Sequence, residues 1–232
     1  MPIYFLDPDF PIFPHPEMAD ENGIVAIGGD LSTERLLTAY SFGIFPWYNE
    51  EDPIIWWSPD PRAVVAPGMV KKSKSMNSYF KKYELRIDTS FEKVINNCKH
   101  IARGGVRESW ITEEMQAAYM ELHRLGYAHS FETWHNNKLI GGLYGVSLGK
   151  CFFGESMFSL ENNASKFAFI NLSKILKAKE FMMIDCQVPN DHLMSMGCKE
   201  LSRKEYLHNM RINLSHKTHR GSWENWHGTQ GG

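Results

Sequence analysis

The chain has 232 residues, of which 43% are hydrophobic and 22% charged, a composition typical of globular proteins and not of disordered ones. This length suits one large domain or two modest ones. No apolar run reaches the roughly 18 residues that a membrane helix needs, and the N-terminus lacks the basic-then-apolar pattern of a secretory signal. We therefore expect a soluble, cytoplasmic protein that does not contact a membrane.

Cysteine and histidine usage indicates neither disulfides nor a metal site. The four cysteines are Cys98, Cys151, Cys186 and Cys198, and they form no C-x-x-C pair. Three of them lie in apolar stretches, which favours reduced, buried thiols in a reducing compartment. The sequence also lacks an H-E-x-x-H motif, so we expect no metal and no cofactor.

The formal net charge of −2 conceals an uneven distribution along the chain. Residues 1–60 contain eleven acidic residues and one basic residue, Arg35, whereas residues 61–232 contain sixteen acidic and twenty-four basic residues. Such an asymmetry indicates two units, of which the second has a polyanionic partner. The alternative is that the two units neutralise each other across their interface.

The first unit, which we place at residues 1–62, is expected to be a small α/β domain. Its first 30 residues are rich in Pro, Asp and Gly and predict an irregular segment ending in an extended piece. Ser32 can cap a helix that runs to about Ser41 and ends at Gly43. Residues 43–62 hold three Trp among prolines, which favours a loop that presents flat rings. These rings could equally pack the two units together.

The second unit, residues 63–232, alternates between strand and helix patterns. Strands are predicted at 83–88, 129–135, 139–148, 151–158, 181–188 and 199–201, and helices from Ser90, Thr112, Asn163, Asn190 and Ser202. Residues 212–232 are polar, and we expect them to be poorly packed. The order predicts an α+β fold with a mixed sheet flanked by helices.

That order is similar to the acetyltransferase-type (GNAT) fold, whose central strands separate to admit an acyl donor. The usual acetyl-coenzyme A signature is a glycine-rich turn whose backbone N–H groups hold the pyrophosphate. Here the corresponding turn, residues 159–165, contains no Gly and adds a negative charge at Glu161. A coenzyme A donor is therefore disfavoured.

Three polar side chains stand out within apolar strand patterns. Glu155 interrupts the aromatic stretch 151–159, and Asp185 and Gln187 interrupt the stretch 181–188. Residues two apart in a strand share a face, so Asp185 and Gln187 are expected to point the same way. A buried carboxylate is costly unless it is paired, hydrogen-bonded or used, so the alternatives are a small-molecule or catalytic site and a structural hydrogen-bonded centre.

Eight short motifs, spread from about residue 20 to 210, resemble the bacterial leucyl/phenylalanyl-tRNA–protein transferases. They are Gly28-Gly-Asp-Leu31, Gly43-Ile-Phe-Pro-Trp47, Trp56-Trp-Ser-Pro-Asp-Pro-Arg62, Ser109-Trp-Ile-Thr112, Gly154-Glu-Ser-Met-Phe-Ser159, Asn163-Ala-Ser-Lys166, Ile184-Asp-Cys-Gln187 and Asn190-Asp-His192. The resemblance implies transfer of Leu, and also of Phe or Met, from aminoacyl-tRNA to proteins that begin with Arg or Lys, which marks them for degradation by the N-end rule pathway.

The resemblance also implies roles for the three polar residues. Asp185 and Gln187 match the family's catalytic pair, with Asp185 fixing the orientation of the Gln187 amide. Glu155 matches the family's third polar residue and could bind or deprotonate the attacking ammonium. Because the donor is an ester and the product an amide, the reaction needs no ATP and no covalent enzyme intermediate.

The remaining site residues are likewise implied by the match. The apolar pocket for Leu or Phe corresponds to Leu143, Phe152, Met157, Phe169 and Ile184. Trp47 and Trp110 match positions that stack on the terminal adenosine of the tRNA. Contacts to acceptor-stem phosphates would come from Lys71, Lys72, Lys74, Lys81 and Lys82, although a solvated charged face explains these lysines equally well.

Three other functions remain open from the sequence. One is an acetyl-coenzyme A-dependent N-acetyltransferase, and another is a cell-wall aminoacyl transferase on a related fold. The third is a non-catalytic RNA-binding module in which the polar centre is structural. We expect the aminoacyl transferase to be a monomer.

Overall fold

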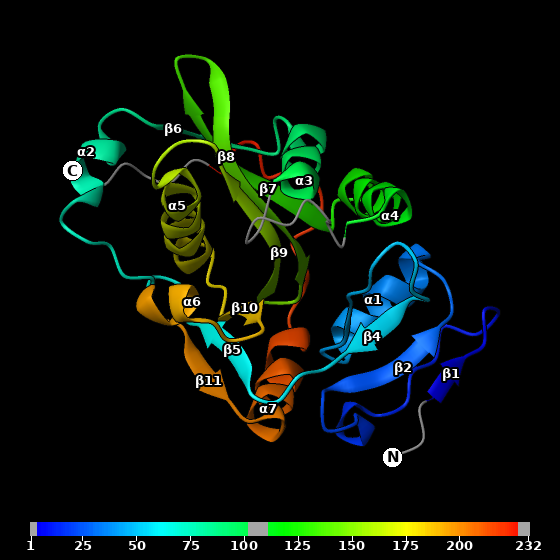
Figure 1. Cartoon of the computed structure of the whole chain (residues 1–232). Coiled ribbons are helices and arrows are strands. Elements are labelled where there is room, and N and C mark those ends of the chain that lie inside the picture. The colour runs from blue at the N-terminus through cyan, green and yellow to red at the C-terminus, as the bar shows by residue number, and fades with distance from the viewer. Residues whose placement is uncertain (1–3, 102–110, 227–232) are drawn as a thin grey trace.

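The computed structural model describes residues 4–101 and 111–226, which form two β-sheets flanked by helices (Figure 1). The smaller sheet has four strands in the order β1-β2-β4-β3. Its strands are β1 (Tyr4–Leu6), β2 (Ile24–Gly28), β3 (Phe45–Pro46) and β4 (Ile55–Trp57), accompanied by the short 3-10 helix η1 (Pro16–Met18) and by α1 (Thr33–Ser41). The Ser32 hydroxyl caps α1 as predicted, because it accepts a hydrogen bond from the Arg35 backbone N–H.

The larger sheet has seven strands in the order β11-β5-β10-β9-β8-β7-β6. They are β5 (Arg62–Val65), β6 (Glu84–Ile87), β7 (Ala128–His135), β8 (Lys138–Leu148), β9 (Cys151–Ser159), β10 (Met183–Gln187) and β11 (Lys199–Leu201). Neighbouring strands run antiparallel except β9 and β10, which are parallel. The predicted mixed sheet is therefore confirmed.

Helices cover both faces of the larger sheet. One face contacts α3 (Phe91–His100) and α4 (Glu113–Arg124), and α5 (Ala164–Ala178) packs on strands β7, β8 and β9. The remaining helices are α2 (Met76–Phe80), α6 (Asp191–Ser195) and α7 (Arg203–Leu214). The alternation along β9 separates the two cores, because Phe153 packs with the α3 and α4 side chains whereas Phe152 packs with those of α5.

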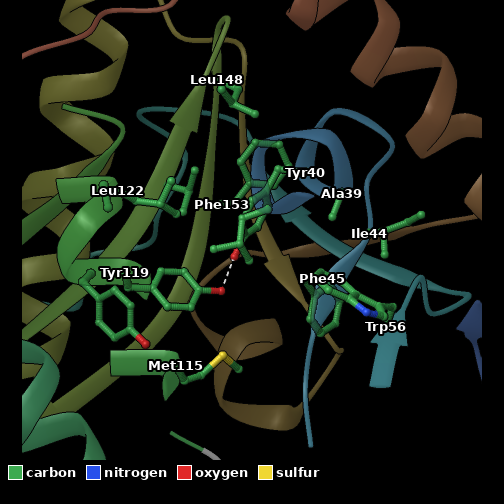
Figure 2. Close-up of a cluster of buried hydrophobic side chains, with 14 of the residues drawn as sticks. Ala39, Tyr40, Ile44, Phe45, Trp56, Met115, Tyr119, Leu122, Leu148 and Phe153 are labelled. Atoms are coloured by element: carbon green, nitrogen blue, oxygen red, sulfur yellow. Dashed lines mark hydrogen bonds between the residues drawn. The ribbon is translucent and has the colours of Figure 1, made fainter. Parts of the chain in front are cut away.

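The N-terminal segment shares a hydrophobic core with the larger sheet. Figure 2 shows Tyr40 of α1 and Phe45 of β3 in the same cluster as Tyr119 of α4 and Phe153 of β9. Trp56 belongs to this cluster and is fully buried, with its indole N–H donating to the Gly28 carbonyl oxygen at 2.9 Å. Side chains from the first 60 residues thus reach the region where the polar residues lie.

The loop predicted for residues 43–62 is wrong, because β3 and β4 within it pair antiparallel, with Phe45 opposite Trp57 and Pro46 opposite Trp56. Proline lacks the N–H that a central strand needs, and here it sits on β3, at the edge of the smaller sheet. The proline-rich composition of residues 43–62 favours a loop in a sequence-based prediction, and this is why β3 and β4 are not predicted. The strand β5 was also not predicted, and the proposed division at residue 62 falls at its first residue.

The poor packing predicted for residues 212–232 is also wrong for the described part of that segment. Trp223 is only 1% exposed and stacks on the His129 ring with centroids 3.6 Å apart. Its backbone N–H donates to Asp88 Oδ2 at 2.8 Å. Isolated aromatic residues in a polar stretch give no periodic signal, so the sequence pattern did not reveal this contact. Within residues 4–101 and 111–226, every helix is too short or too polar to cross a membrane.

Candidate active site

The site lies where β9 and β10 separate. The two strands pair only between Cys151–Phe153 and Met183–Asp185. Beyond these residues β9 continues along β8, whereas β10 shifts register against β5 between Asp185 and Gln187. Gln187 has a positive φ of 62°, which is uncommon for a residue with a side chain and marks a bulge at this point.

This bulge sends the Asp185 side chain away from that of Gln187. The Asp185 carboxylate is fully buried and accepts hydrogen bonds from Arg62 Nε at 2.9 Å and Arg62 Nη2 at 2.7 Å. It also accepts from the Tyr206 hydroxyl at 2.7 Å and from the Gln187 backbone N–H at 2.8 Å. Although burial opposes the charge on Arg62, Asp185 holds the pKa of Arg62 above its ordinary value. Asp185 is therefore one half of a buried, bidentate ion pair.

The Tyr206 ring reaches Asp185 because residue 43 is a glycine. Gly43 has a φ of 70°, and a Cβ atom there would lie 2.5 Å from the Tyr206 ring. Any larger residue would displace the ring whose hydroxyl donates to Asp185. Gly43 therefore serves both to end α1 and to admit Tyr206.

Glu155 is the centre of a second hydrogen-bond network. Its Oε1 accepts from the Tyr40 hydroxyl at 2.7 Å and from Gln187 Nε2 at 2.8 Å, and its Oε2 accepts from the Tyr119 hydroxyl at 3.1 Å. The two tyrosine hydroxyls also hydrogen-bond to each other. The Gln187 amide is thus oriented by Glu155, and Asp185 instead holds the Gln187 backbone, which corrects the role predicted for Asp185.

The Glu155 network contains a carboxyl group that titrates near neutrality. Burial raises the pKa of Glu155 to about 7, and the hydrogen bonds from Tyr40 and Tyr119 partly oppose this rise. Burial raises the pKa of both tyrosines well above the usual value, so they remain neutral donors. At neutral pH Glu155 therefore exists in both protonation states, as a proton acceptor requires.

An apolar cavity of about 420 Å³ opens beside Glu155 and Gln187. This volume falls within the roughly 300–1,000 Å³ typical of small-ligand sites. Five residues predicted for substrate binding line it, namely Trp47, Leu143, Met157, Phe169 and Ile184. Residues that the prediction missed also line it: Phe45, Pro46, Tyr144, Gly154, Ser156, Leu172, Cys186, Val188, Asn190 and Leu193. The cavity can accept an apolar side chain next to a group that exchanges protons.

Two of the predicted binding residues do not line the cavity. Phe152 is fully buried and packs edge-on against Phe131 and beside Trp223, in the core on the α5 side of the sheet. Trp110 lies outside the described residues. Trp47, in contrast, is 43% exposed at the cavity, and its carbonyl oxygen accepts from the Trp57 indole N–H at 2.6 Å.

The five predicted lysines are all exposed, and they precede or follow α2 in the chain: Lys71, Lys72, Lys74, Lys81 and Lys82. A further lysine joins them from α5, because Lys72 Nζ and Lys174 Nζ lie 4.1 Å and 4.9 Å from the centre of the same Phe80 ring. Burial lowers the pKa of Lys174, and the charge of Lys72 lowers it further. We call these six residues the lysine cluster. The positive charges of Lys72 and Lys174 repel each other, and a bound anion would relieve that repulsion.

Among the described residues, no three His, Cys, Asp or Glu side chains gather in a way that could hold a metal ion. The polar groups that line the cavity include the Glu155 carboxyl, the Gln187 amide, and hydroxyl or amide side chains such as Ser156 and Asn190. This set can position an amine and an ester and can accept a proton.

Residues 64–211 match the family profile described as leucyl/phenylalanyl-tRNA protein transferase, and residues 29–60 match the profile of that protein's N-terminal domain. The chain belongs to the leucyl/phenylalanyl-tRNA protein transferase family. This result confirms the resemblance that the sequence motifs indicated.

Curated relatives carry the name leucyl/phenylalanyl-tRNA–protein transferase and match over nearly their whole length. The relative from Myxococcus xanthus is 48% identical over 226 residues, covering 96% of this chain and 97% of its own. Those from Syntrophobacter fumaroxidans and Syntrophus aciditrophicus are 47% and 50% identical and cover 97% and 91% of this chain and 96% and 90% of their own. As a member of this transferase family, the chain is an aminoacyltransferase.

Similarity to solved structures is more remote. A conserved protein of unknown function from Staphylococcus epidermidis aligns with a TM-score of 0.42 and 8% identity, over 77% of this chain and 68% of its own. L-PGS from Bacillus licheniformis aligns with a TM-score of 0.37 and 10% identity, over 69% of this chain and 52% of its own. The α+β class of this family member rests on its own two mixed sheets.

Proposed function

We propose that the protein transfers leucine or phenylalanine from aminoacyl-tRNA to the α-amino group of proteins that begin with Arg or Lys, which marks them for degradation by the N-end rule pathway. The observation that carries the proposal is the apolar cavity in whose wall the Glu155 carboxyl and the Gln187 amide meet. The family membership of the chain gives the reaction class, and the cavity gives the place for the transferred side chain.

The apolar residues of the cavity hold the side chain of the aminoacyl group. Binding there fixes the ester carbonyl near Glu155 and Gln187, which converts a bimolecular encounter into an aligned reaction. Of the lining residues, Leu143 comes from β8, and Phe169 and Leu172 come from α5. Because apolar pockets separate similar side chains by only about 1–3 kcal/mol, this cavity suits Leu and Phe alike.

The chemical step is aminolysis of an ester. The acceptor's α-amine attacks the ester carbonyl carbon, the C–N bond forms, and the C–O bond to the terminal ribose breaks. Glu155 takes the proton that the amine loses, and the departing ribose oxygen gains a proton. The Gln187 amide nitrogen donates to Glu155, which leaves the amide oxygen to accept from the amine and direct its lone pair.

A preference for an N-terminal Arg or Lys is supported by negative charge near the cavity. The ionised form of Glu155 favours a cationic acceptor. Glu50, Glu51 and Asp52, all exposed, follow Trp47 in the connection between β3 and β4. These acidic side chains, which follow the cavity-lining Trp47 in the chain, attract a basic peptide.

The aminoacyl-tRNA is held by stacking and by charge. The exposed ring of Trp47 at the cavity stacks on the terminal adenosine, which contributes roughly 1–3 kcal/mol regardless of sequence. The lysine cluster contacts phosphates of the acceptor stem. The separation of β9 from β10 supports a GNAT-like fold for the larger sheet. We also propose that the chain has two domains divided near residue 62 and acts as a monomer in the cytoplasm.

The function is tested with labelled Leu-tRNA and two peptides that differ only in starting with Arg or Glu. We expect label transfer to the Arg peptide alone. Gln187→Asn is a suitable variant because Asn tolerates a positive φ while the shorter side chain withdraws the amide from Glu155. Transfer should fall at least tenfold with tRNA binding intact. Unchanged transfer would remove Gln187 from the mechanism, and tRNA binding without any transfer by the wild type would favour an RNA-binding module.

A further inference from the structure

Two cysteine thiols lie in contact close to the Glu155 network. Cys186 Sγ and Cys198 Sγ are 3.7 Å apart, although the two residues come from β10 and from the turn that precedes β11. Cys186 is the residue between Asp185 and Gln187, at the bulge that orients both side chains. Cys198 follows Gly197, whose φ of 100° marks a second irregular piece of backbone.

Each thiol of the pair lines a different cavity. Cys186 is half-buried and lines the cavity beside Glu155, whereas Cys198 is 5% exposed and lines a second cavity of about 600 Å³. That second cavity is bordered by the exposed side chains of Met69, Met182 and Ile212. A small reagent can therefore approach the pair from either cavity.

We infer that Cys186 and Cys198 form a modification site at which a small-molecule disulfide oxidises the two thiols to an intramolecular disulfide. The sulfur atoms must approach from 3.7 Å to about 2.05 Å, and the irregular backbone at both residues can supply this movement. The existence of the site does not depend on the proposed function, but its effect on transfer does.

The reaction proceeds by two thiol–disulfide exchanges. The contact with Cys186 lowers the pKa of Cys198, and the same contact raises the pKa of Cys186, so the first thiolate forms at Cys198. Cys198 attacks one sulfur of the reagent and releases one thiolate. Cys186 then loses its proton, attacks Cys198 Sγ and releases the second thiolate. The two protein thiols together lose two electrons and become a disulfide. The reagent gains these two electrons and is reduced to two thiols.

Disulfide formation would alter the cavity beside Glu155. Pulling Cys186 toward Cys198 moves the segment that carries Gln187, whose amide nitrogen lies 2.8 Å from Glu155 Oε1. It also withdraws a side chain from the cavity wall. We expect the oxidised protein to transfer at least tenfold more slowly, because catalytic groups must keep their positions to well within 1 Å.

The test treats the full-length protein with oxidised glutathione, alkylates the remaining thiols and measures intact and peptide masses. We expect loss of two hydrogen atoms, with the link mapped between Cys186 and Cys198. A thiol reductant should restore both the mass and the transfer rate. The variant Cys198→Ser should transfer normally and resist inactivation, whereas Cys98→Ser, which keeps the pair, should behave like the wild type.

Two results would overturn the inference. If glutathione stays attached at single cysteines, or the pair remains reduced while another cysteine reacts, the site does not exist. If the disulfide forms and transfer stays constant, the pair does not influence the cavity. The mass measurement needs no activity, so a failure of the proposed function remains distinguishable from a failure of the site.

Discussion

Glu155 combines burial with hydrogen-bond partners that carry no charge. Only 8% of the residue is exposed, and its partners are two tyrosine hydroxyls and one amide. Asp185, on the neighbouring strand β10, is paired with Arg62 instead. The two carboxyl groups therefore have different tasks, since Asp185 fixes the backbone at the bulge and Glu155 exchanges protons.

Replacing Glu155 by Gln should stabilise the protein at alkaline pH. The folded-state pKa of about 7 exceeds the ordinary value of 4.5, so the protonated group stabilises the fold below pH 4.5 and this contribution is lost as pH rises through 7. Urea unfolding at pH 8 should show Glu155→Gln more stable than the wild type by about 1–3 kcal/mol, with little difference at pH 4.5. Transfer should be lost.

A matched control for that measurement is Glu121→Gln, since Glu121 lies on the exposed face of α4 and pairs with Arg124. It should change stability by under about 0.5 kcal/mol at both pH values. Equal stability of Glu155→Gln and wild type at pH 8 would show that burial does not perturb Glu155.

Tyr40 should tune the pH dependence of transfer. Its hydroxyl lowers the pKa of Glu155, so Tyr40→Phe raises that pKa and moves the rising limb of the pH–rate profile to higher pH. Tyr119→Phe should shift the profile less, because its hydrogen bond is longer, at 3.1 Å compared with 2.7 Å. A purely structural role for Tyr40 would instead lower the rate equally at every pH.

At the scale of elements, the described C-terminal segment acts as part of the core on the α5 side. Trp223 contacts His129, Phe131, Phe152 and Phe181, and Trp226 stacks on it with centroids 4.0 Å apart. These contacts lie behind β9, the strand that carries Glu155. The segment therefore supports the sheet at the level of the active site.

Truncating Trp223 should be among the most damaging single changes outside the cavity. Trp223→Ala is expected to cost about 3–5 kcal/mol in the free energy of unfolding, measured with urea, because it empties a buried site. Trp226→Ala is the matched control, since Trp226 is only partly buried and its loss should cost clearly less. Equal effects of the two changes would mean that the segment is held by general contact area and not by Trp223.

The elements that the sequence revealed are those with a local signal. Ser32 and Thr112 mark helix starts with side-chain caps, and alternating patterns marked β7, β8 and β9. The missed elements depend on distant partners. Strand β5 is only four residues long and takes its place from pairing with β10 and β11.

Among the site residues, too, those with a local sequence motif could be predicted, and those that depend on distant partners could not. The motif match identified Glu155, Gln187 and most apolar lining residues, but the alternation rule misdirected Asp185 because a bulge interrupts β10. The partners of Glu155 could not be predicted, since Tyr40 and Tyr119 lie far from it in sequence and carry no local sign of their role. Phe152 belongs to the same core as the lining residues Leu143 and Ile184, but its ring is fully buried against other aromatic side chains and does not reach the cavity.

At the scale of the whole molecule, the lysine cluster predicts how tRNA binding responds to salt. Each phosphate contact adds roughly 0.7–0.9 to the slope of log affinity against log salt. The double variant Lys72→Ala/Lys174→Ala should weaken tRNA binding and reduce this slope by about 1.5, measured by titration at several salt concentrations. These two lysines share the Phe80 ring, so they are expected to act together.

The matched control is Lys204→Ala, which removes an exposed lysine on α7, away from α2 and α5 (Figure 1). It should leave both the affinity and the slope nearly unchanged. An identical slope for the wild type and the double variant would assign the lysine cluster to a solvated surface.

The position of Trp223 also bears on how the chain folds as it leaves the ribosome. Strands β7, β8 and β9 leave the ribosome well before Trp223. Phe131 and Phe152 therefore lack their contact with the Trp223 ring until the C-terminal segment has been synthesised. Nascent domains with exposed apolar faces are prone to aggregation and attract chaperones. A chain whose synthesis stops before residue 223 therefore exposes apolar core surface, and we expect chaperones and proteases to recognise it before it can act as an enzyme.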